Sequence, residues 1–330
     1  MTTPLVSVVM PVRNAAETVE RAVQSIRRQT LSDWELIAID DGSEDDTGSR
    51  LSAMARRDSR IQPVPNTGCG IVPALNTGLS LARGHFVARM DADDVSEPER
   101  LEEQSRFLQE RPGIGLVGSL VAFGGDRELA GGFALHVDWL NSVASPDEIA
   151  LNRFVESPFA HPSVMFRRDL LAQQGGYRDG DFPEDYELWL RWLEAGVTMA
   201  KVPRVLLTWN DSPKRLSRAD ARYRVEAFYR CKAPYLSRWL RANVDPRRSI
   251  WIWGAGRETR RRVDLLSDRG VLVRGYVDID PRKQGRLVQG RPVVSPEDLP
   301  CRADVFVLGY VAKRGARQFI RSSLSARGFV

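Results

Sequence analysis

Apolar runs and amphipathic stretches alternate along the first part of the chain. Mostly apolar runs at Leu5–Met10, Trp34–Ile39 and His85–Arg89 have the length of buried strands. Asn14 followed by Glu17 marks the start of an amphipathic helix between the first two runs. Strands that alternate with helices in this way predict an α/β fold with a mostly parallel, doubly wound sheet and helices on both faces.

Further along, the pattern predicts a helix over residues 98–110, an apolar strand at Gly115–Phe123 and a strong helix that opens at Pro183. Residues 124–145 contain glycine and show only weak periodicity, so we expect a loop there. Residues 197–209 are expected to form two short strands separated by a proline.

A change in composition marks the end of this region. Residues 214–248 contain eleven basic and three acidic residues, with aromatic residues interleaved, and most of them are predicted to be helical. The apolar strand Ser249–Trp253 then opens a second, smaller α/β unit, in which a glycine-containing turn precedes a helix. The sequence therefore predicts a first domain of residues 1–213, a basic helical linker of residues 214–248, and a small domain of residues 249–330.

The composition is that of a globular protein rather than a membrane-spanning or disulfide-rich one. Hydrophobic residues make up 42% of the 330 residues and charged residues 28%. No apolar run reaches the roughly 18 residues that a membrane span requires, and the N-terminus lacks the features of a signal peptide. Cys69, Cys231 and Cys301 are far apart and odd in number, which favours reduced thiols and a cytoplasmic location.

The strongest chemical signal follows the run at His85–Arg89. Asp91, Asp93 and Asp94 place three carboxylates within four positions. Loops at the carboxyl ends of parallel strands are where open α/β sheets bind ligands. Oxygen ligands with open positions suit Mg²⁺ or Mn²⁺, which usually share their coordination shell with substrate phosphates. The alternative, from the residues alone, is a solvated acidic turn that caps the helix starting near Pro98.

Four sequence blocks within the first 215 residues resemble the family-2 glycosyltransferases. The blocks are VSVVMPVRN, LIAIDDGSEDDT, NTGCGIVPALNTGLSLARGHFVARMDADD and FPEDYELWLRW, in the family's order and at family-like separations. The stretch ARMDADDVSEPERLEEQ is especially similar to bacterial members that build surface polysaccharides. The resemblance implies the GT-A nucleotide-diphosphosugar transferase fold and transfer of a sugar from a nucleotide sugar.

The resemblance also implies how the donor is bound. Pro11, Val12 and Asn14 would line the nucleotide pocket, and Asp41 matches the acid that hydrogen-bonds the base, usually uracil. Read without the family, Asp41 with the glycine and serine that follow it is also a plain turn.

The acidic loop matches the family's DxD motif. Asp93 would bind the divalent metal, and Asp91 would reach the ribose or a metal-bound water, so we place both at the metal site. Asp94 is expected to cap the next helix. The metal would stabilise the negative charge that develops on the β-phosphate of the leaving group.

Glu184 and Asp185 match the family's ED motif. The resemblance makes Asp185 the general base that deprotonates the acceptor hydroxyl, and it places Glu184 among the nucleotide-sugar-binding residues. The first turn of a helix stabilises an anion and weakens a base, so burial near Trp189 or the charge of the substrate must compensate. The alternative is ordinary acidic charge at a helix N-terminus.

Three further residues enter through the resemblance. His161 would line the donor sugar, or else have a structural role. Arg215 and Arg218 lie where the family has a basic loop that closes on the pyrophosphate, although they also fit a solvated helix start. The chain departs from the family at Leu75 and Asn210, where arginine is common, and this weakens the phosphate assignments.

The C-terminal part resembles small Rossmann-like domains attached to sugar-modifying enzymes. Gly254 and Gly256 follow a strand and form a candidate ligand loop, with Asp278 placed to reach a ribose. Thr259 replaces the third glycine of the dinucleotide fingerprint. A docking or assembly module is therefore the favoured interpretation of this domain.

Together these patterns predict a metal-dependent, inverting hexosyl- or N-acetylhexosaminyltransferase that uses a nucleotide sugar, expected to be a UDP-sugar. The acceptor would be a hydroxyl of a surface glycan or a lipid-linked glycan, with no nucleic-acid partner. The basic stretch 214–248 predicts peripheral contact with anionic membrane at the inner face of the cytoplasmic membrane, or else packing of its aromatic residues against the catalytic domain. The rival classes are a nucleotidyltransferase, whose glycine-rich loop is absent from PVRNAAE, and an inactive nucleotide-sugar-binding scaffold.

Overall fold

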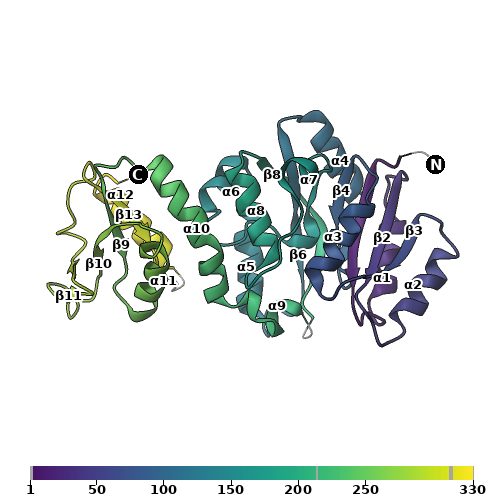
Figure 1. The fold of residues 1–330 in the computed structure, drawn as a ribbon, viewed down its shortest axis with the longest axis horizontal. Helices are drawn as coiled ribbons and strands as arrows, with labels where there is room; N and C mark the ends of the chain where they lie inside the picture. The colour runs from purple at the N-terminus through teal and green to yellow at the C-terminus, as the bar shows by residue number, and fades with distance from the viewer. Residues whose placement is uncertain (1–2, 213–214, 312–314, 330) are drawn as a thin grey trace. The chain divides into compact units, whose positions relative to one another are not determined.

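The structure is a computed structural model that describes residues 3–212, 215–311 and 315–329. The chain divides into two compact units, Met1–Arg224 and Val225–Val330, each with its own sheet (Figure 1). The predicted basic linker does not form a separate unit by this division, since its first residues belong to the first unit and the rest to the second. The assignment of catalytic and Rossmann-like roles to these parts stays a proposal.

An eight-stranded sheet forms the centre of the first unit. Its strands are β1 (Val6–Val12), β2 (Trp34–Asp40), β3 (Ile61–Pro65), β4 (Phe86–Arg89), β5 (Val95–Ser96), β6 (Ile114–Gly124), β7 (Met165–Arg167) and β8 (Thr198–Asn210). They lie in the order β3-β2-β1-β4-β7-β6-β8-β5. Strands β3, β2, β1 and β4 pair in parallel, as do β6 and β8, whereas β7 and β5 are antiparallel to their neighbours. The predicted mostly parallel sheet is confirmed.

Helices cover both faces of this sheet, as predicted. They are α1 (Val19–Arg27), α2 (Thr47–Ala55), α3 (Ile71–Leu81), α4 (Arg100–Glu110), α5 (Gly131–Asn141), α6 (Pro146–Asn152), α7 (Leu170–Gln174), α8 (Glu184–Glu194) and α9 (Leu216–Ala219), with 3₁₀ turns η1 (His161–Ser163) and η2 (Ala221–Tyr223). Side chains of a strand alternate between faces. Val8 and Met10 of β1 therefore belong to the core that contains α1, while Val9 belongs to the core that contains α3 and α8.

Three expectations about individual elements are wrong. Residues 131–141 form helix α5, whose buried Ala134, Val137 and Leu140 follow a three-residue spacing. Residues 198–210 form one strand, β8, in which register shifts replace the predicted break. Helix α1 begins at Val19 with no side-chain cap, so Asn14 does not start it. The helix expected near Pro98 is present as α4, which spans Arg100–Glu110.

The second unit is a five-stranded sheet with three helices among the described residues. The elements are α10 (Val225–Asn243), β9 (Ser249–Trp253), α11 (Arg257–Ser267), β10 (Val273–Val277), β11 (Leu287–Val288), β12 (Arg291–Val294), β13 (Val305–Gly309) and α12 (Ala316–Ala326). The strand order is β11-β12-β10-β9-β13, parallel except at β11. This arrangement confirms the predicted small α/β fold.

Two aromatic residues of the basic stretch contact rings of the second unit. Tyr229 of α10 lies 5.6 Å from the ring of Tyr310, and Trp239 lies 6.2 Å from the ring of Phe306. Among the described helices, none combines the length and the apolar character that crossing a bilayer requires.

Candidate active site

The carboxyl ends of β1, β2 and β4 meet at one edge of the sheet, and the loops that follow them interlock there. Asn14, after β1, adopts a left-handed conformation with φ +47°. Its main-chain nitrogen donates to the Ser43 hydroxyl over 2.9 Å, and its side-chain oxygen accepts from the Glu44 nitrogen over 2.8 Å. Asn14 thus fastens the loop after β1 to the loop after β2, in place of its predicted role as a helix cap.

Asp41 is a buried carboxylate at this edge rather than the acceptor of a plain turn. It accepts hydrogen bonds from the Asn66 amide over 2.6 Å and from the Gly70 nitrogen over 3.0 Å. Arg13 approaches to 3.6 Å. The local turn is instead closed by Asp40, which accepts from the Ser43 nitrogen. Asp41 therefore lies where three loops converge, and its contact with a base stays a prediction. Pro11 and Val12, predicted to line the same pocket, are buried in β1.

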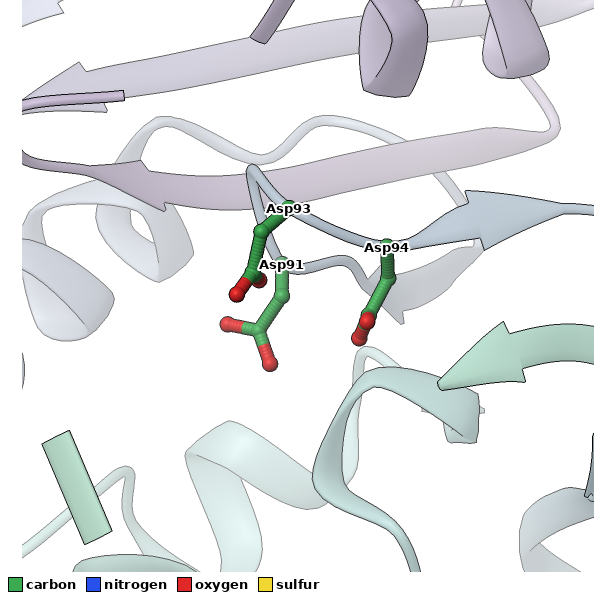
Figure 2. A group of neighbouring side chains, drawn as sticks. All are labelled: Asp91, Asp93 and Asp94. Carbon is green, nitrogen blue, oxygen red and sulfur yellow. The ribbon is translucent and has the colours of Figure 1, made fainter. Parts of the chain in front are cut away.

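The three aspartates after β4 form a compact acidic cluster (Figure 2). One carboxylate oxygen from each of Asp91, Asp93 and Asp94 lies within 4.8 Å of the others. Asp94 does not cap a helix, which corrects the prediction. One of its oxygens accepts from the Asn210 main-chain nitrogen over 2.8 Å, while the other is buried without a hydrogen-bond partner. The Asn210 amide also donates to the Asp93 carbonyl over 2.7 Å, so the end of β8 holds the acidic loop.

The cluster fits a divalent cation. Burial and the charge of Asp91 raise the pKa of Asp93 to about 6. Burial and the charges of Asp91 and Asp93 raise the pKa of Asp94 well above its ordinary value. Three close carboxylates repel one another, and a hard cation with oxygen ligands removes that repulsion. The orphaned oxygen of Asp94 and the donor chemistry of the cluster thus match Mg²⁺ or Mn²⁺, with Asp91 and Asp93 as the residues that would hold it.

Two arginines compensate part of this negative charge. Arg89, buried at the end of β4, forms an ion pair with Asp91. The guanidinium of Arg215 lies 4.3 Å from the centre of the Phe133 ring and 4.6 Å from that of Trp209. Burial lowers the pKa of Arg215, and the negative charges of the aspartates oppose that lowering. The guanidinium of Arg215 therefore interacts electrostatically with the acidic cluster.

Arg218, predicted beside Arg215 on the pyrophosphate, is paired with Asp211, which Arg215 also approaches to 3.8 Å. The guanidinium of Arg218 makes hydrogen bonds of 2.6 and 2.7 Å with the two carboxylate oxygens of Asp211. The predicted phosphate role of both arginines stays a prediction, and the geometry favours Arg215 over Arg218.

Glu184 and Asp185 open helix α8. Asp185 is partly buried, and one of its oxygens accepts from the Tyr186 nitrogen over 2.7 Å. Burial and the neighbouring charge of Glu184 raise the pKa of Asp185 to about 7. Burial thus outweighs the lowering of the Asp185 pKa that the helix N-terminus was expected to cause. A carboxylate with a pKa near 7 is well suited to accept a proton at neutral pH.

Glu184 and His161 are buried together. The Tyr223 hydroxyl donates to Glu184 over 2.6 Å, and His161 Nδ1 lies 3.9 Å from the other carboxylate oxygen. His161 Nε2 lies 2.7 Å from the Tyr177 hydroxyl. Burial and nearby Arg89 hold the pKa of His161 well below its ordinary value, so the imidazole is neutral. His161 thus has the protein partners of a structural histidine, and its contact with a donor sugar stays a prediction.

A hydrogen bond within the second unit joins its candidate ligand loop to Asp278, which follows β10. The Asp278 carboxylate accepts from the Ala255 nitrogen over 2.9 Å and lies 3.0 Å from Lys283 Nζ. Gly254 has φ +110°, and a Cβ there would meet Val311 and Thr259. Asp278 therefore has partners within the unit, and the roles of Asp278, Gly254 and Gly256 in binding a ligand stay predictions.

Several residues around the site were not identified from the sequence. Phe133 was missed because α5 was predicted to be a loop, although the three-residue spacing of its apolar positions was a usable signal. Arg89 adjoins the DxD motif and ends a buried strand, and that position was also a signal. Tyr177 and Tyr223 reach the site through contacts between distant segments, for which the sequence carried no local signal.

Comparison with known proteins finds a family model and several relatives that match this chain. The family described as glycosyl transferase family 2 matches residues 7–175. The amylovoran biosynthesis glycosyltransferase AmsE of Erwinia amylovora is 32% identical over 195 residues, which are 58% of this chain and 70% of AmsE. The UDP-Glc:alpha-D-GlcNAc-diphosphoundecaprenol beta-1,3-glucosyltransferase WfgD of Escherichia coli is 30% identical over 196 residues, which are 58% of this chain and 70% of WfgD.

Among solved structures, S. aureus TarS 1-349 in complex with UDP-GlcNAc has a similar fold. The TM-score is 0.54 at 16% sequence identity, over 80% of this chain and 70% of the TarS chain. In a longer TarS structure the match covers 43% of that chain. At this level of identity the similarity shows the fold alone.

Proposed function

Because the chain belongs to glycosyl transferase family 2, we propose that it transfers a sugar from a UDP-sugar to a hydroxyl of a surface-glycan or lipid-linked acceptor, with inversion at the anomeric carbon. The observation that carries the proposal is that the first unit contains both an acidic cluster and a separate carboxylate with a raised pKa. The acidic cluster at residues 91–94 suits a metal-bound diphosphate, and Asp185 has a pKa of about 7 that suits a general base.

The loops after β1 and β2 would hold the nucleoside. The Asp41 carboxylate, fixed by Asn66 and Gly70, would accept a hydrogen bond from the base. A buried, pre-positioned acceptor reads an N–H group of a base such as uracil without reorganising when the donor binds. The preference for UDP also has support from WfgD, whose name specifies UDP-glucose.

Asp93 and Asp91 would hold the divalent cation, which when bound offsets the negative charge of the departing diphosphate. Arg215 has a related part. Its cation, which lies over the rings of both Phe133 and Trp209 and is attracted by the charges of the aspartates, would pair with the diphosphate oxygens.

Asp185 would take the proton from the acceptor hydroxyl. The acceptor oxygen then bonds to the anomeric carbon as the bond from that carbon to the phosphate oxygen breaks. The proton remains on Asp185, and the nucleoside diphosphate leaves with the electron pair. A single in-line displacement of this kind inverts the anomeric configuration.

Thermal unfolding with a panel of donors tests the function. UDP-glucose, UDP-N-acetylglucosamine, UDP-glucuronate and GDP-mannose would each be added with Mn²⁺, and release of the nucleotide measured in parallel. A ligand at 100 times its Kd stabilises the folded state by about 2.7 kcal/mol, so at least one UDP-sugar is expected to raise Tm by several degrees and to be turned over. No shift in Tm and no nucleotide release with any donor, with either Mn²⁺ or Mg²⁺, would refute the proposal.

We propose that the predicted membrane contact is electrostatic. Tyr229 and Trp239 of α10 contact rings of the second unit, whereas Arg230, Arg238 and Arg241 are exposed. At 3.6 residues per turn these three positions lie within an arc of about 80° on one side of the helix. Each basic residue near an anionic leaflet contributes roughly 1 kcal/mol, so this face supports weak, salt-sensitive attachment next to a lipid-linked acceptor.

Liposome sedimentation checks this prediction. We expect the protein to sediment with vesicles that contain anionic lipid at low salt, and to stay in the supernatant with neutral vesicles or at high salt. Changing Arg230, Arg238 and Arg241 together to glutamine should abolish sedimentation, whereas Arg261→Gln on exposed α11 should not. Equal recovery in the supernatant under all conditions would contradict the membrane contact.

A further inference from the structure

Glu184 is a buried carboxylate whose side-chain partner comes from a distant segment. Its exposed fraction is 3%, and a carboxylate without partners in such a place is costly. His161 Nδ1, at 3.9 Å, is beyond hydrogen-bond distance, and the other ring nitrogen of His161 is engaged by Tyr177. The Tyr223 hydroxyl, at 2.6 Å, makes the short hydrogen bond to Glu184.

Tyr223 is itself held in place by a small, self-contained turn. Asp220 accepts from the Arg222 main-chain nitrogen over 2.8 Å and from the Arg222 guanidinium over 2.7 and 3.0 Å. This turn, η2, ends at Tyr223. This turn therefore positions the Tyr223 phenol for its hydrogen bond to Glu184.

The segment of residues 215–223, which we name the linking segment, touches both halves of the candidate site. At its start, Arg215 stacks on Phe133 and Trp209 beside the acidic cluster. At its end, Tyr223 is hydrogen-bonded to the residue that precedes Asp185. One short segment thus joins the groups assigned to the diphosphate and the groups assigned to the base.

We infer that Tyr223 is a positioning residue of the transferase, whose hydroxyl holds Glu184 beside Asp185 and thereby ties the linking segment to the base. This inference rests on the proposed function, since it gives Tyr223 a task only if Asp185 accepts the acceptor's proton.

The bond has a chemical consequence for Asp185. Donation from Tyr223 lowers the pKa of Glu184, against the larger effect of burial, which raises it. An ionised Glu184 in turn raises the pKa of Asp185 and makes it a stronger base. The other groups that act on this pair are His161 from η1, Tyr177 from the loop before α8, Arg89 from β4 and Arg222 from η2.

Tyr223→Phe tests the inference, because it removes one oxygen atom and keeps the ring. Hydrogen bonds to charged groups contribute roughly 10- to 100-fold to an equilibrium, and we expect kcat to fall about 10-fold while KM for the donor changes less than twofold. Glu184 then protonates more easily and repels Asp185 less. The acid limb of the rate profile should therefore move to lower pH.

Tyr186→Phe is the matched control. The Tyr186 hydroxyl also donates over 2.7 Å from a buried ring, but to the carbonyl of Arg153 rather than to a carboxylate. We expect this variant to lose stability equally at all pH values and to keep the acid limb in place. The loss of stability in Tyr223→Phe should be larger at pH 8 than at pH 5, because the bond stabilises the ionised form of Glu184, which is the form lost at low pH.

The measurements are unfolding at pH 5 and pH 8, and UDP release from the donor that the panel identifies. An unmoved acid limb with kcat within twofold of wild type in Tyr223→Phe overturns the inference while leaving the proposed function intact. A limb that moves equally in both variants also overturns it. Absence of Asp185-dependent turnover in the wild type, with every donor of the panel, overturns the proposed function and this inference with it.

Discussion

Asp185→Asn is expected to lower the rate of sugar transfer by on the order of 10²-fold or more while leaving donor affinity nearly unchanged. An amide cannot accept the acceptor's proton, and removal of a positioned general base typically costs 10²- to 10⁴-fold. The fold should survive. Burial and the charge of Glu184 raise the pKa of Asp185 from 3.8 to about 7. Folding therefore costs free energy as the pH rises between these two values, with the full cost present above pH 7, and the neutral amide removes this cost.

The pH profile gives a second readout of Asp185. The base works only when ionised, so wild-type turnover should fall about tenfold per pH unit below an apparent pKa near 7. The residual activity of Asp185→Asn should lack this limb. Asp181→Asn, an exposed neighbour on the preceding loop, is the control and should behave as wild type. Near-normal transfer by Asp185→Asn would eliminate the base assignment, and loss of folding would favour a purely structural role at the start of α8.

Asp93→Ala is expected to abolish Mn²⁺-dependent binding of UDP, with a loss of at least 100-fold in affinity that corresponds to about 2.7 kcal/mol. The reason lies in the donor set. Removing Asp93 leaves Asp91 as the remaining predicted metal ligand, and Asp91 is already paired with Arg89. Without a bound cation, the diphosphate is repelled by the negative charge of the remaining aspartates. Isothermal titration with UDP, with and without Mn²⁺, measures the effect.

The fold of the Asp93→Ala variant should be retained, because its main-chain carbonyl still accepts from the Asn210 amide and the charge repulsion within the cluster is lower. Asp126→Ala, on an exposed loop of the same unit, is the control. UDP binding by Asp93→Ala that is as tight and as metal-dependent as in the wild type would show that the cation is held elsewhere.

The parts of the site that the sequence predicted correctly are those encoded locally. The runs that became β1, β2 and β4 could be read from their apolar residues, and parallel strands place the loops that follow them at one edge. The acidic cluster was therefore expected, and the structure brings its three carboxylates together. The start of α8 at Glu184 followed from the same kind of local pattern.

The parts that were missed depend on contacts between distant positions. The bond from Tyr223 to Glu184 spans 39 residues, and the hydrogen bonds between Asn76 and Tyr177 span 101. Tyr223 lies in the basic, aromatic stretch of residues 214–248, for which the sequence left open membrane contact or packing of the aromatic residues against the catalytic domain. The sequence could not show that Tyr223 would meet Glu184, because no periodicity records which distant segment a loop will contact.

Arg100 shows the same limit in the core. An arginine on an acidic helix is expected at the surface, yet its side chain is fully buried and donates to the Arg89 carbonyl over 2.6 Å and to the Ser96 hydroxyl over 2.9 Å. The charge is tolerated because polar atoms surround it. Whether a buried arginine finds hydrogen-bond acceptors cannot be predicted before its neighbours in the fold are known.

The attachment of the acidic loop to Asn210 constrains how this protein can be recombined with its relatives. Asp94 accepts from the main chain of Asn210, and the side chain of Asn210 binds the carbonyl of Asp93, so two positions more than a hundred residues apart fit each other as a pair. A hybrid of two relatives that are joined at any point between residues 95 and 209 would take the acidic loop from one parent and the end of β8 from the other. Crossovers after Arg224, where the two compact units divide, leave this pair intact and are the places to exchange the C-terminal unit.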